Sequence, residues 1–230
     1  MSSFRGYAIC TQPRSGSNLL GQYLSSTNLL GHPLEYFNGP GRRALGLPDF
    51  PEDPRLQLEA ILRIGSTPNR VYAVKIFASQ LDAVSRSIRW ADALPNLRFI
   101  YLTRDDLLGQ AISWARALQT GQFRSAQPAR GAPVYDPDLI RTQLTIIVRE
   151  RAQWEAYFAR TGISPLRVVY ESFLEARAAQ VQRIAAMMEV AGALIDESKI
   201  DLVPQRDALT EAWRKRFRDE HGDPNVLDAI

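Results

Sequence analysis

The stretch of sequence that decides the fold reads Tyr7-Ala8-Ile9-Cys10-Thr11-Gln12-Pro13-Arg14-Ser15-Gly16-Ser17-Asn18-Leu19-Leu20. A short apolar run ends at a polar turn, and apolar residues at helical spacing follow directly after the turn. The stretch therefore predicts a strand, a tight loop and a helix in immediate succession. This arrangement places the positive end of the helix dipole at the loop, where it favours a bound anion.

The residues of this loop have the chemistry that an anion site needs. Gly16 allows the backbone to approach a ligand closely. Arg14 adds a fixed positive charge with a forked set of donors that suits phosphate or sulfate. Ser15, Ser17 and Asn18 offer side-chain donors, and one of them can cap the helix. We expect these groups, together with the first free N–H groups of the helix, to bind an anion.

The loop differs from the Walker A motif, which needs a Gly at its start and a Lys before its final Ser or Thr. A nucleotide kinase would need that Lys and carboxylates for Mg²⁺. The residues alone also leave a second interpretation open. In that interpretation the loop is an ordinary strand-to-helix turn, and Arg14 is incidental.

The composition of the chain is that of a globular protein. Its 230 residues suit a single domain over residues 1–230 with a sizeable core. Hydrophobic residues make up 45% and charged residues 23%, as is typical of soluble proteins. The net charge of +3 does not require a nucleic-acid partner, and it is compatible with a polyanionic small molecule.

Cysteine and histidine usage restricts the other classes of site. The single cysteine, Cys10, excludes a disulfide within the chain, and its apolar surroundings predict a buried thiol. Two histidines, His32 and His221, are too few for a His-rich metal site, so we expect no metal. No apolar stretch approaches the roughly 20 residues of a membrane span, and residues 1–6 lack the apolar core of a secretory signal. We therefore expect a cytoplasmic protein without an integral membrane segment.

Apolar runs and helical spacings alternate along the chain. The sequence predicts strands at residues 6–11, 71–77, 97–102 and 166–170. It predicts helices at residues 18–27, 55–64, 79–90, 105–120, 137–160, 177–190 and 207–220, and long loops at 38–54 and 120–136. This alternation indicates an α/β fold with a mainly parallel central sheet flanked by helices on both faces.

Three basic residues lie at or just after the ends of predicted strands, namely Arg14, Lys75 and Arg104. Ligands of such sheets bind beyond the carboxyl ends of the strands. We therefore expect the three cations to line one binding site. Lys75 ends an apolar strand, where an unpaired charge is costly, so it forms either a structural ion pair or a ligand contact.

The stretch Gln12–Leu20 resembles the 5′-phosphosulfate loop of sulfotransferases that use 3′-phosphoadenosine 5′-phosphosulfate (PAPS). The Arg form of this loop, followed by Leu34-Glu35-Tyr36-Phe37-Asn38, resembles the bacterial trehalose 2-sulfotransferase (Stf-type) family. Similar blocks recur in order at residues 72–80, 99–125, 139–173 and 204–218, so the resemblance covers nearly the whole chain. It implies a P-loop-like sulfotransferase fold.

The resemblance also implies which residues hold the donor. Arg14 and the rest of its loop would bind the 5′-phosphosulfate. Arg104 and Ser113 would bind the 3′-phosphate, although a surface Arg and an ordinary helical Ser remain alternatives from the residues alone. Arg206 would make a further phosphate contact. Trp114, next to Ser113, is interpreted as a core residue.

The base for catalysis is also implied by the resemblance. Many sulfotransferases take the acceptor proton with a His two residues after the strand Lys, but this chain has Phe77 there. The family motif places the base at Glu35, whose pKa would have to rise through burial or a like charge. His32 is the alternative base. Lys75 would contact the transferring sulfonate or the bridging oxygen.

The implied reaction moves a sulfonate from PAPS to a hydroxyl of a carbohydrate or glycolipid. Loops 38–54 and 120–136 are expected to select that acceptor. The resemblance further implies a homodimer, for which the aromatic-bearing helix 137–160 offers apolar surface. Two other classes remain open: a nucleotide kinase-like phosphotransferase, and a non-catalytic nucleotide-binding protein that would have no need of Glu35.

Overall fold

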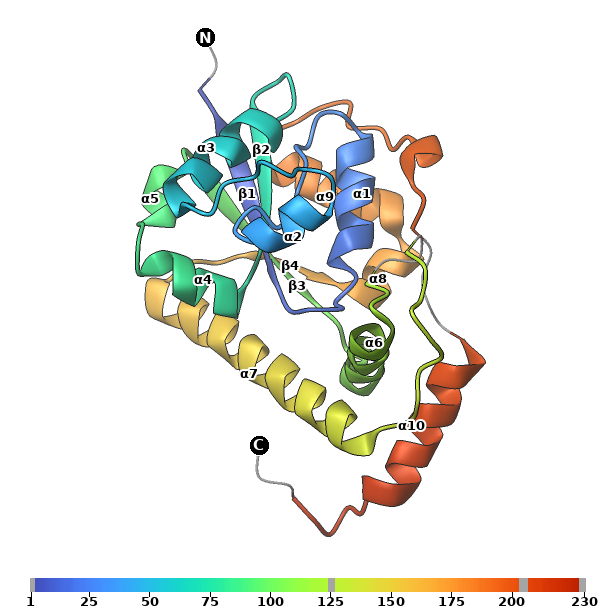
Figure 1. The fold of residues 1–230 in the computed structure, drawn as a ribbon. Coiled ribbons are helices and arrows are strands. Elements are labelled where there is room, and N and C mark those ends of the chain that lie inside the picture. The colour runs from blue at the N-terminus through green and yellow to red at the C-terminus, as the bar shows by residue number, and fades with distance from the viewer. Residues whose placement is uncertain (1–2, 124–126, 203–206, 228–230) are drawn as a thin grey trace.

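The computed structural model describes residues 3–123, 127–202 and 207–227. Within these ranges the strands form one four-stranded parallel sheet in the order β2-β1-β3-β4 (Figure 1). The strands are β1 (Arg5–Thr11), β2 (Val71–Phe77), β3 (Leu97–Thr103) and β4 (Leu166–Val169). The α/β class and the parallel sheet predicted from the sequence are confirmed.

The order of the strands determines where a ligand can bind. The chain passes from β1 outward to β2 and then returns across β1 to β3, so the direction of winding reverses at β1. In open sheets of this kind the crevice at the reversal, beyond the carboxyl ends of the strands, is the usual binding site. Here that crevice lies between the residues that follow β1 and β3.

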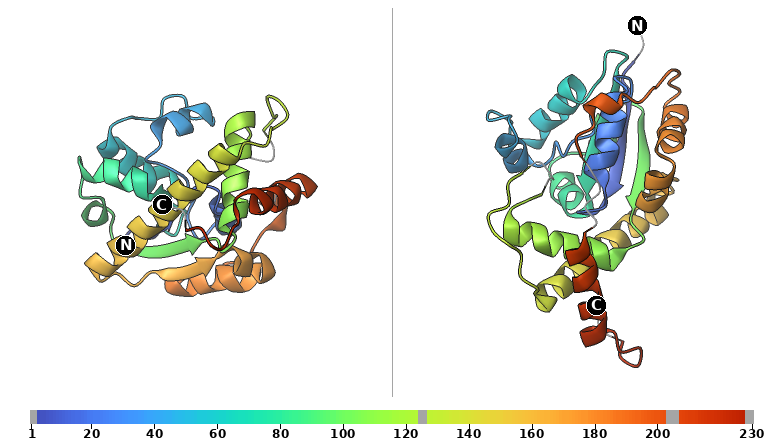
Figure 2. Two further views of the ribbon diagram at one scale, coloured as in Figure 1. Left: turned by 90° about the horizontal axis from the view of Figure 1, so that it is seen from below. Right: turned by 90° about the vertical axis from the view of Figure 1, so that its right-hand side faces the viewer.

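Side chains of β1 alternate between the two faces of the sheet. Tyr7 and Ile9 pack against the helices of one face, which are α1 (Ser17–Ser26), α8 (Tyr170–Glu175) and α9 (Arg177–Met187). Ala8 and Cys10 pack against the other face, which α3 (Pro54–Ile64), α4 (Ala78–Ser85), α5 (Trp90–Ala93) and α7 (Pro137–Thr161) cover. Helices therefore cover both faces (Figure 2), which explains why the strands read as nearly continuous apolar runs.

A further apolar cluster lies where α6 (Leu107–Thr120), α7 and α10 (Ala208–His221) meet. Ile112, Ile147, Trp213 and Phe217 belong to it. α10 lies at the lower end of the molecule in Figure 1, away from the sheet. The remaining helical segments are α2 (Gly39–Ala44) and the short 3-10 helix η1 (Glu197–Lys199).

Two predicted elements differ from the structure. The helix expected over residues 79–90 is wrong, because α4 ends at Ser85 and α5 begins at Trp90. The chain turns between them and buries Trp90 edge-on against Phe99, with ring centroids 5.8 Å apart. The loop expected over residues 38–54 contains α2. The Asn38 side chain caps that helix by accepting from the N–H of Gly41 at 3.0 Å, a typical N-cap contact.

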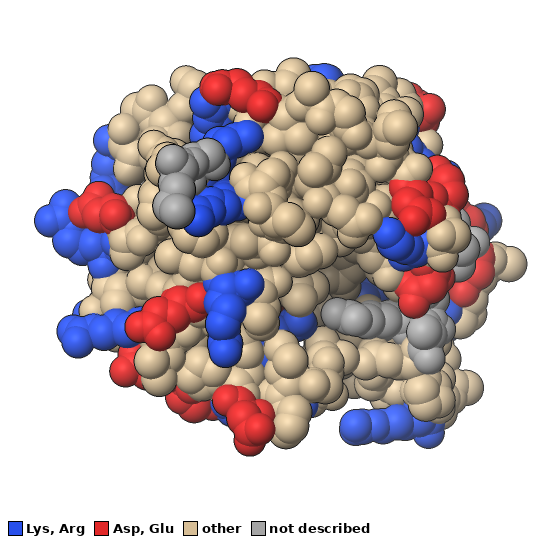
Figure 3. Space-filling model, turned by 90° about the horizontal axis from the view of Figure 1, so that it is seen from above, with Lys and Arg blue, Asp and Glu red and all other residues tan. Residues whose placement is uncertain are grey.

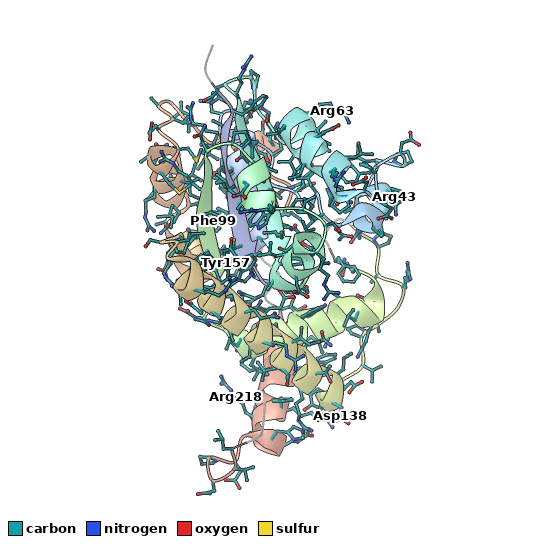
Figure 4. All side chains as sticks on the ribbon, turned by 90° about the vertical axis from the view of Figure 1, so that its left-hand side faces the viewer. Arg43, Arg63, Phe99, Asp138, Tyr157 and Arg218 are labelled. Atoms are coloured by element: carbon teal, nitrogen blue, oxygen red, sulfur yellow. The ribbon has the colours of Figure 1, made fainter. Side chains whose placement is uncertain are left out.

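The aromatic side of α7 lies inside the protein. Trp154 and Phe158 are buried, and the Trp154 indole donates to the carbonyl oxygen of Thr11 at 3.0 Å. Figure 4 shows Tyr157 of α7 beside Phe99 of β3, with ring centroids 6.4 Å apart. Trp154 and Phe158 therefore offer no apolar surface to a second copy, and the expectation that helix 137–160 supplies such a surface stays a prediction.

No helix within the described ranges has both the length and the apolar character needed to cross a membrane. The same ranges contain no group of three or more His, Cys, Asp or Glu side chains arranged to hold a metal ion. On the face drawn in Figure 3, basic and acidic side chains are interspersed around a broad area that carries neither. This mixture accords with the small net charge of +3.

Candidate active site

A cavity of about 680 Å³ opens among the residues that follow the strands, a volume typical of small-molecule sites. Its walls come from the loop after β1, the start of α1, α2, the end of β2, the start of α4, α6, α7 and the residue after β4. The predicted site residues in its lining are Arg14, Gly16, Ser17, Asn18, Glu35, Lys75, Arg104 and Ser113. The fold thus brings together side chains that lie far apart in the sequence.

Gly16 forms the turn between β1 and α1. Its φ of +85° lies in the left-handed region, and a Cβ atom at this position would overlap the ring of Tyr170. Both the backbone angle and the close approach of the ring therefore require glycine. Arg14 also has a positive φ, of 61°. Such an angle is uncommon in a residue other than glycine.

The polar side chains of this loop have different partners. Ser15 is buried, and its hydroxyl lies 2.7 Å from the Thr11 hydroxyl. Asn18 accepts a hydrogen bond from Lys75 at 2.5 Å. Among the described residues no side chain caps α1, whose N-cap is Gly16, so the expected side-chain cap is wrong. The first N–H groups of α1 have no partner inside the helix, and their place at the cavity suits an anion.

Arg14 connects the two predicted anion sites. Its Nε atom donates to the Ser113 hydroxyl at 3.0 Å, and its Nη1 atom donates to the carbonyl oxygen of Phe123 at 2.6 Å. Arg104 donates from Nη1 to the carbonyl oxygen of Arg14 at 3.4 Å. Burial, and then the nearby charge of Arg104, lower the pKa of Arg14 to about 10. A bound anion would relieve the repulsion between these neighbouring cations.

Arg104 follows β3 directly and is almost fully buried. Its guanidinium carbon lies over the ring of Tyr170, 5.3 Å from the centroid. Two carboxylates stand at longer range, with Asp106 Oδ2 3.4 Å from Nη2 and Glu171 Oε1 3.7 Å from Nε. The buried Nε atom has no hydrogen-bond acceptor among the described residues. This unused donor of Arg104 lies in the cavity that Arg14 also lines, and a guanidinium N–H suits an anionic ligand.

Lys75 and Glu35 form an ion pair in the same cavity, with 2.8 Å between Nζ and Oε1 and with side chains 3% and 17% exposed. The pair forms because the segment before Glu35 runs alongside β2. Leu34 forms a parallel bridge with Val74, and the N–H of Lys75 donates to the Leu34 carbonyl at 2.9 Å. The sequence left two roles open for Lys75, a structural ion pair or a ligand contact. The structure contains the ion pair.

The surroundings of Glu35 favour its charged form. Burial raises its pKa, but the attraction of Lys75, with help from Asn38 and Arg42, outweighs burial and lowers the pKa to about 2. Asn38 donates to Oε2 at 3.1 Å, and Gln80 donates to the same atom at 3.4 Å. The expectation that the pKa of this carboxyl is raised is therefore wrong for this arrangement, because cations and amide donors surround it.

His32 is not among the described residues that line the cavity. Its N–H donates to the carbonyl oxygen of Gly65 at 2.9 Å, and its own carbonyl accepts from the Tyr36 hydroxyl at 2.9 Å. Burial lowers the pKa of its imidazole. Of the two candidate bases, Glu35 is the one that reaches the cavity.

Sequence analysis missed several cavity residues. Glu150 of α7 is buried and accepts from the N–H groups of Ala78 at 3.0 Å and Ser79 at 3.3 Å, which fixes the turn after β2. Tyr170 directly follows β4, so the strand-end rule that selected the three cations would also have selected it. Gln80 has no comparable signal, because a Gln on a helix is usually an exposed residue.

Trp114, interpreted as core, packs against the apolar cluster of α6, but it also lines the cavity. Arg206, assigned a phosphate contact, lies outside the described residues.

Comparison with known proteins identifies relatives over almost the whole chain. The family model described as Stf0 sulphotransferase matches residues 6–220. A trehalose 2-sulfotransferase of Mycobacterium tuberculosis (strain ATCC 35801 / TMC 107 / Erdman) is 27% identical, with 94% of this chain and 95% of the relative covered. A second, from Mycolicibacterium smegmatis (strain ATCC 700084 / mc(2)155), is 23% identical, with 92% and 94% covered.

Solved structures with the same fold are also sulfotransferase domains. The domain from the Synechococcus PCC 7002 olefin synthase has a TM-score of 0.52 and 16% identity, covering 100% of this chain and 91% of that chain. The domain from the curacin biosynthetic pathway has a TM-score of 0.50 and 14% identity, covering 94% and 98%. At these identities the likeness shows the fold alone, and the predicted sulfotransferase fold is confirmed.

Proposed function

The chain belongs to the Stf0 sulphotransferase family, and we propose that it transfers a sulfonate group from PAPS to a hydroxyl of a carbohydrate or glycolipid. One observation carries the proposal: the Lys75–Glu35 pair shares a single cavity with Arg14 and Arg104. Sulfonate transfer needs cations at the leaving phosphate and a base at the acceptor hydroxyl. Side chains of both kinds line this cavity.

The donor would lie across the arginine cluster. Arg14, Ser17 and the first N–H groups of α1 would hold the 5′-phosphosulfate. Arg104 and Ser113 would hold the 3′-phosphate. The 3.0 Å contact between Arg14 and Ser113 supports this assignment, because the residues proposed for the two phosphate groups are neighbours. Arg206 is proposed as an additional phosphate contact on the resemblance alone.

The acceptor half of the reaction would depend on Glu35 and Lys75. Bound PAPS supplies an electrophilic sulfur and a phosphate leaving group. The acceptor oxygen forms a bond to sulfur, the bond from sulfur to the bridging oxygen breaks, and the acceptor proton passes to Glu35. Lys75, held by Asn18, would stabilise the charge on the bridging oxygen. As Lys75 turns toward that charge it attracts Glu35 less, so the pKa of Glu35 rises and the carboxylate becomes a stronger base.

The curated relatives support a carbohydrate acceptor, since both are named trehalose 2-sulfotransferase. Asn38 and Gln80 carry amide groups beside Glu35 that suit sugar hydroxyls. Leu45 and Phe123 are exposed apolar residues in the lining of the same cavity. Their presence supports a glycolipid as well as a free sugar.

Incubation with PAPS and separate acceptors, analysed by mass spectrometry, tests the proposal. Trehalose, glucose and an alkyl glucoside form a suitable panel, and we expect one of them to gain a single SO₃ group. If the protein binds 3′-phosphoadenosine 5′-phosphate (PAP) in calorimetry but sulfates none of them, the carbohydrate acceptor is wrong. If it binds neither PAPS nor PAP, the donor is wrong. Phosphate transfer from ATP would support the kinase-like alternative instead.

A further inference from the structure

Helices α6 and α10 are joined by two reciprocal ion pairs, each between an arginine of one helix and the aspartate that caps the other. Asp106 caps α6 by accepting from the N–H of Gly109 at 2.9 Å. Arg214 of α10 contacts both oxygens of Asp106, at 2.5 and 2.7 Å. Asp207 caps α10 in the same way, and Arg116 of α6 contacts both of its oxygens at 2.8 Å. The pairs are alike in chemistry and geometry.

The two ion pairs between α6 and α10 differ in the residues that lie beside them. Oδ2 of Asp106 lies 3.4 Å from Nη2 of Arg104, the residue proposed to hold the 3′-phosphate. The same oxygen lies much closer to Arg214, at 2.7 Å. Asp106 is therefore shared unequally between two arginines, and the closer of them is not in the lining of the cavity. No contact of Asp207 with Arg104 is present among the described residues.

The unequal sharing has an electrostatic consequence for Arg104. The hydrogen bonds from Arg214 hold the pKa of Asp106 far below its usual value, so this carboxylate carries its charge throughout the physiological range. A charged Asp106 without Arg214 would be free to form a close pair with Arg104. That pair would neutralise the guanidinium and would occupy donors that a phosphate needs.

We propose that Arg214 is a positioning residue of the donor site. By binding both oxygens of Asp106, it keeps that carboxylate from pairing closely with Arg104, and Arg104 stays available for the 3′-phosphate. The inference rests on the proposed function, because it assumes a donor with a 3′-phosphate. Docking of α10 does not by itself need this pair, since Trp213, Phe217 and the Arg116–Asp207 pair also hold the helix in place.

Calorimetry with two nucleotides distinguishes positioning from docking. PAP carries the 3′-phosphate, and adenosine 5′-phosphate lacks it. We expect Arg214→Gln to weaken PAP binding about tenfold or more and to leave adenosine 5′-phosphate binding nearly unchanged. The matched control is Arg116→Gln, which breaks the other pair and should keep the wild-type preference for PAP. An equal loss of that preference in both variants would show that the pairs merely dock α10, and would overturn the inference.

A second substitution tests the competition directly. Asp106→Asn keeps a side chain that caps helices well but removes the competing charge. In the Arg214→Gln background it should restore most of the affinity for PAP, whereas a purely structural defect would not be repaired. On its own, Asp106→Asn should bind PAP more tightly than the wild type, because a negative charge beside the phosphate has been removed. Weaker PAP binding by Asp106→Asn alone would overturn the inference even if Arg214→Gln did not fold.

The measurements also separate this inference from the proposed function. A wild-type protein that binds PAP and adenosine 5′-phosphate equally would overturn the proposed donor site and the inference with it. A wild type that prefers PAP, combined with an Arg214→Gln variant of unchanged preference, would overturn the inference alone.

Discussion

Lys75 Nζ lies 2.8 Å from Oε1 of Glu35, and the two side chains reach this contact from segments 40 residues apart in the chain. The ammonium group lies near the end of β2, an edge strand of the sheet, and the carboxylate follows Leu34, which forms a bridge with the same strand. The ammonium group of Lys75 therefore lowers the pKa of the Glu35 carboxyl. If the same cation also faces the leaving group, the release of the proton and the loss of the phosphate are coupled.

Glu35→Gln should lower kcat by about 10²–10⁴-fold, the usual contribution of a general base. Glutamine keeps the shape and some of the hydrogen bonds but cannot accept the proton, so PAP affinity should barely change. His32→Ala is the control, because His32 is not among the described residues that line the cavity, and it should have a much smaller effect. The opposite ranking, measured in a sulfate-transfer assay, would move the base to His32. Normal turnover by both variants would show that neither residue takes the proton.

Arg104→Ala should cost about 2–4 kcal/mol of PAP affinity, as expected for a buried charge-assisted contact. Its effect on adenosine 5′-phosphate, which lacks the 3′ group, should be much smaller. Arg86→Ala is a control on an exposed arginine whose ion pair among the described residues is with its neighbour Asp82. Calorimetry that finds equal affinities of the wild type for the two nucleotides would remove the role given to Arg104 and Ser113.

Stability should depend on Glu35 in acid. The folded state depresses the pKa of this carboxyl from 4.5 to about 2. Its contribution to the free energy of unfolding is therefore complete above pH 4.5 and is lost as the pH falls toward 2. At neutral pH, Glu35→Gln should lower the free energy of unfolding by about 3 kcal/mol, because the substitution removes the carboxylate that pairs with Lys75.

Urea unfolding of the wild type and Glu35→Gln between pH 2 and pH 7 measures this contribution. The difference between the two proteins should shrink steadily below pH 4.5, since a protonated Glu35 resembles glutamine. A difference that stays constant across that range would mean that the ion pair does not set the acid stability.

Gly16→Ala should destabilise the protein by about 3 kcal/mol or more, because it combines a left-handed backbone angle with an overlap on the Tyr170 ring. The matched control is Gly162→Ala at the end of α7. Gly162 has a φ of +70° and nothing within 4 Å of an added Cβ atom, so it should cost only about 1 kcal/mol. Thermal unfolding compares the two variants. Similar losses would show that the ring contact is unimportant, and a Tyr170→Ala background should relieve the overlap at Gly16.

We expect a homodimer at micromolar concentration, on the resemblance to the trehalose 2-sulfotransferase family. Light scattering tests this, and a monomer would contradict it. Phe158→Ala should lower the free energy of unfolding by about 3 kcal/mol or more without changing the mass in solution. The reason is that Phe158 packs inside its own subunit, against Trp154, with ring centroids 5.8 Å apart.

The sheet was the most predictable part of the molecule. The bounds of β2 are those of the predicted apolar run at 71–77, because a strand buried on both faces leaves a continuous apolar record in the sequence. The short helices have no comparable pattern of apolar residues in the sequence. α8 spans six residues, fewer than two helical turns, so periodicity could not reveal it. The split between α4 and α5 depends on burying Trp90 against Phe99, which is a tertiary contact.

The residues of the candidate site were also predictable in part. The strand-end rule and the family motifs placed Arg14, Lys75 and Arg104 in one region, where they lie. The lowered pKa of Glu35 could not be predicted, because the strongest attraction on this carboxylate comes from Lys75, which lies 40 residues away in the sequence. The contact between Arg14 and Ser113 joins positions 99 residues apart, which spacing within a motif cannot reveal.

The reciprocal caps of α6 and α10 have a consequence for the order in which the molecule assembles. The paired residues are separated by 108 positions for Asp106 and Arg214, and by 91 for Arg116 and Asp207. Contacts of such long sequence separation form late, after the local helices. During synthesis α6 emerges long before the segment that completes its cap. The ion pair of Asp106 with Arg214, which lies beside Arg104, can therefore form only after all four strands of the sheet have been synthesised.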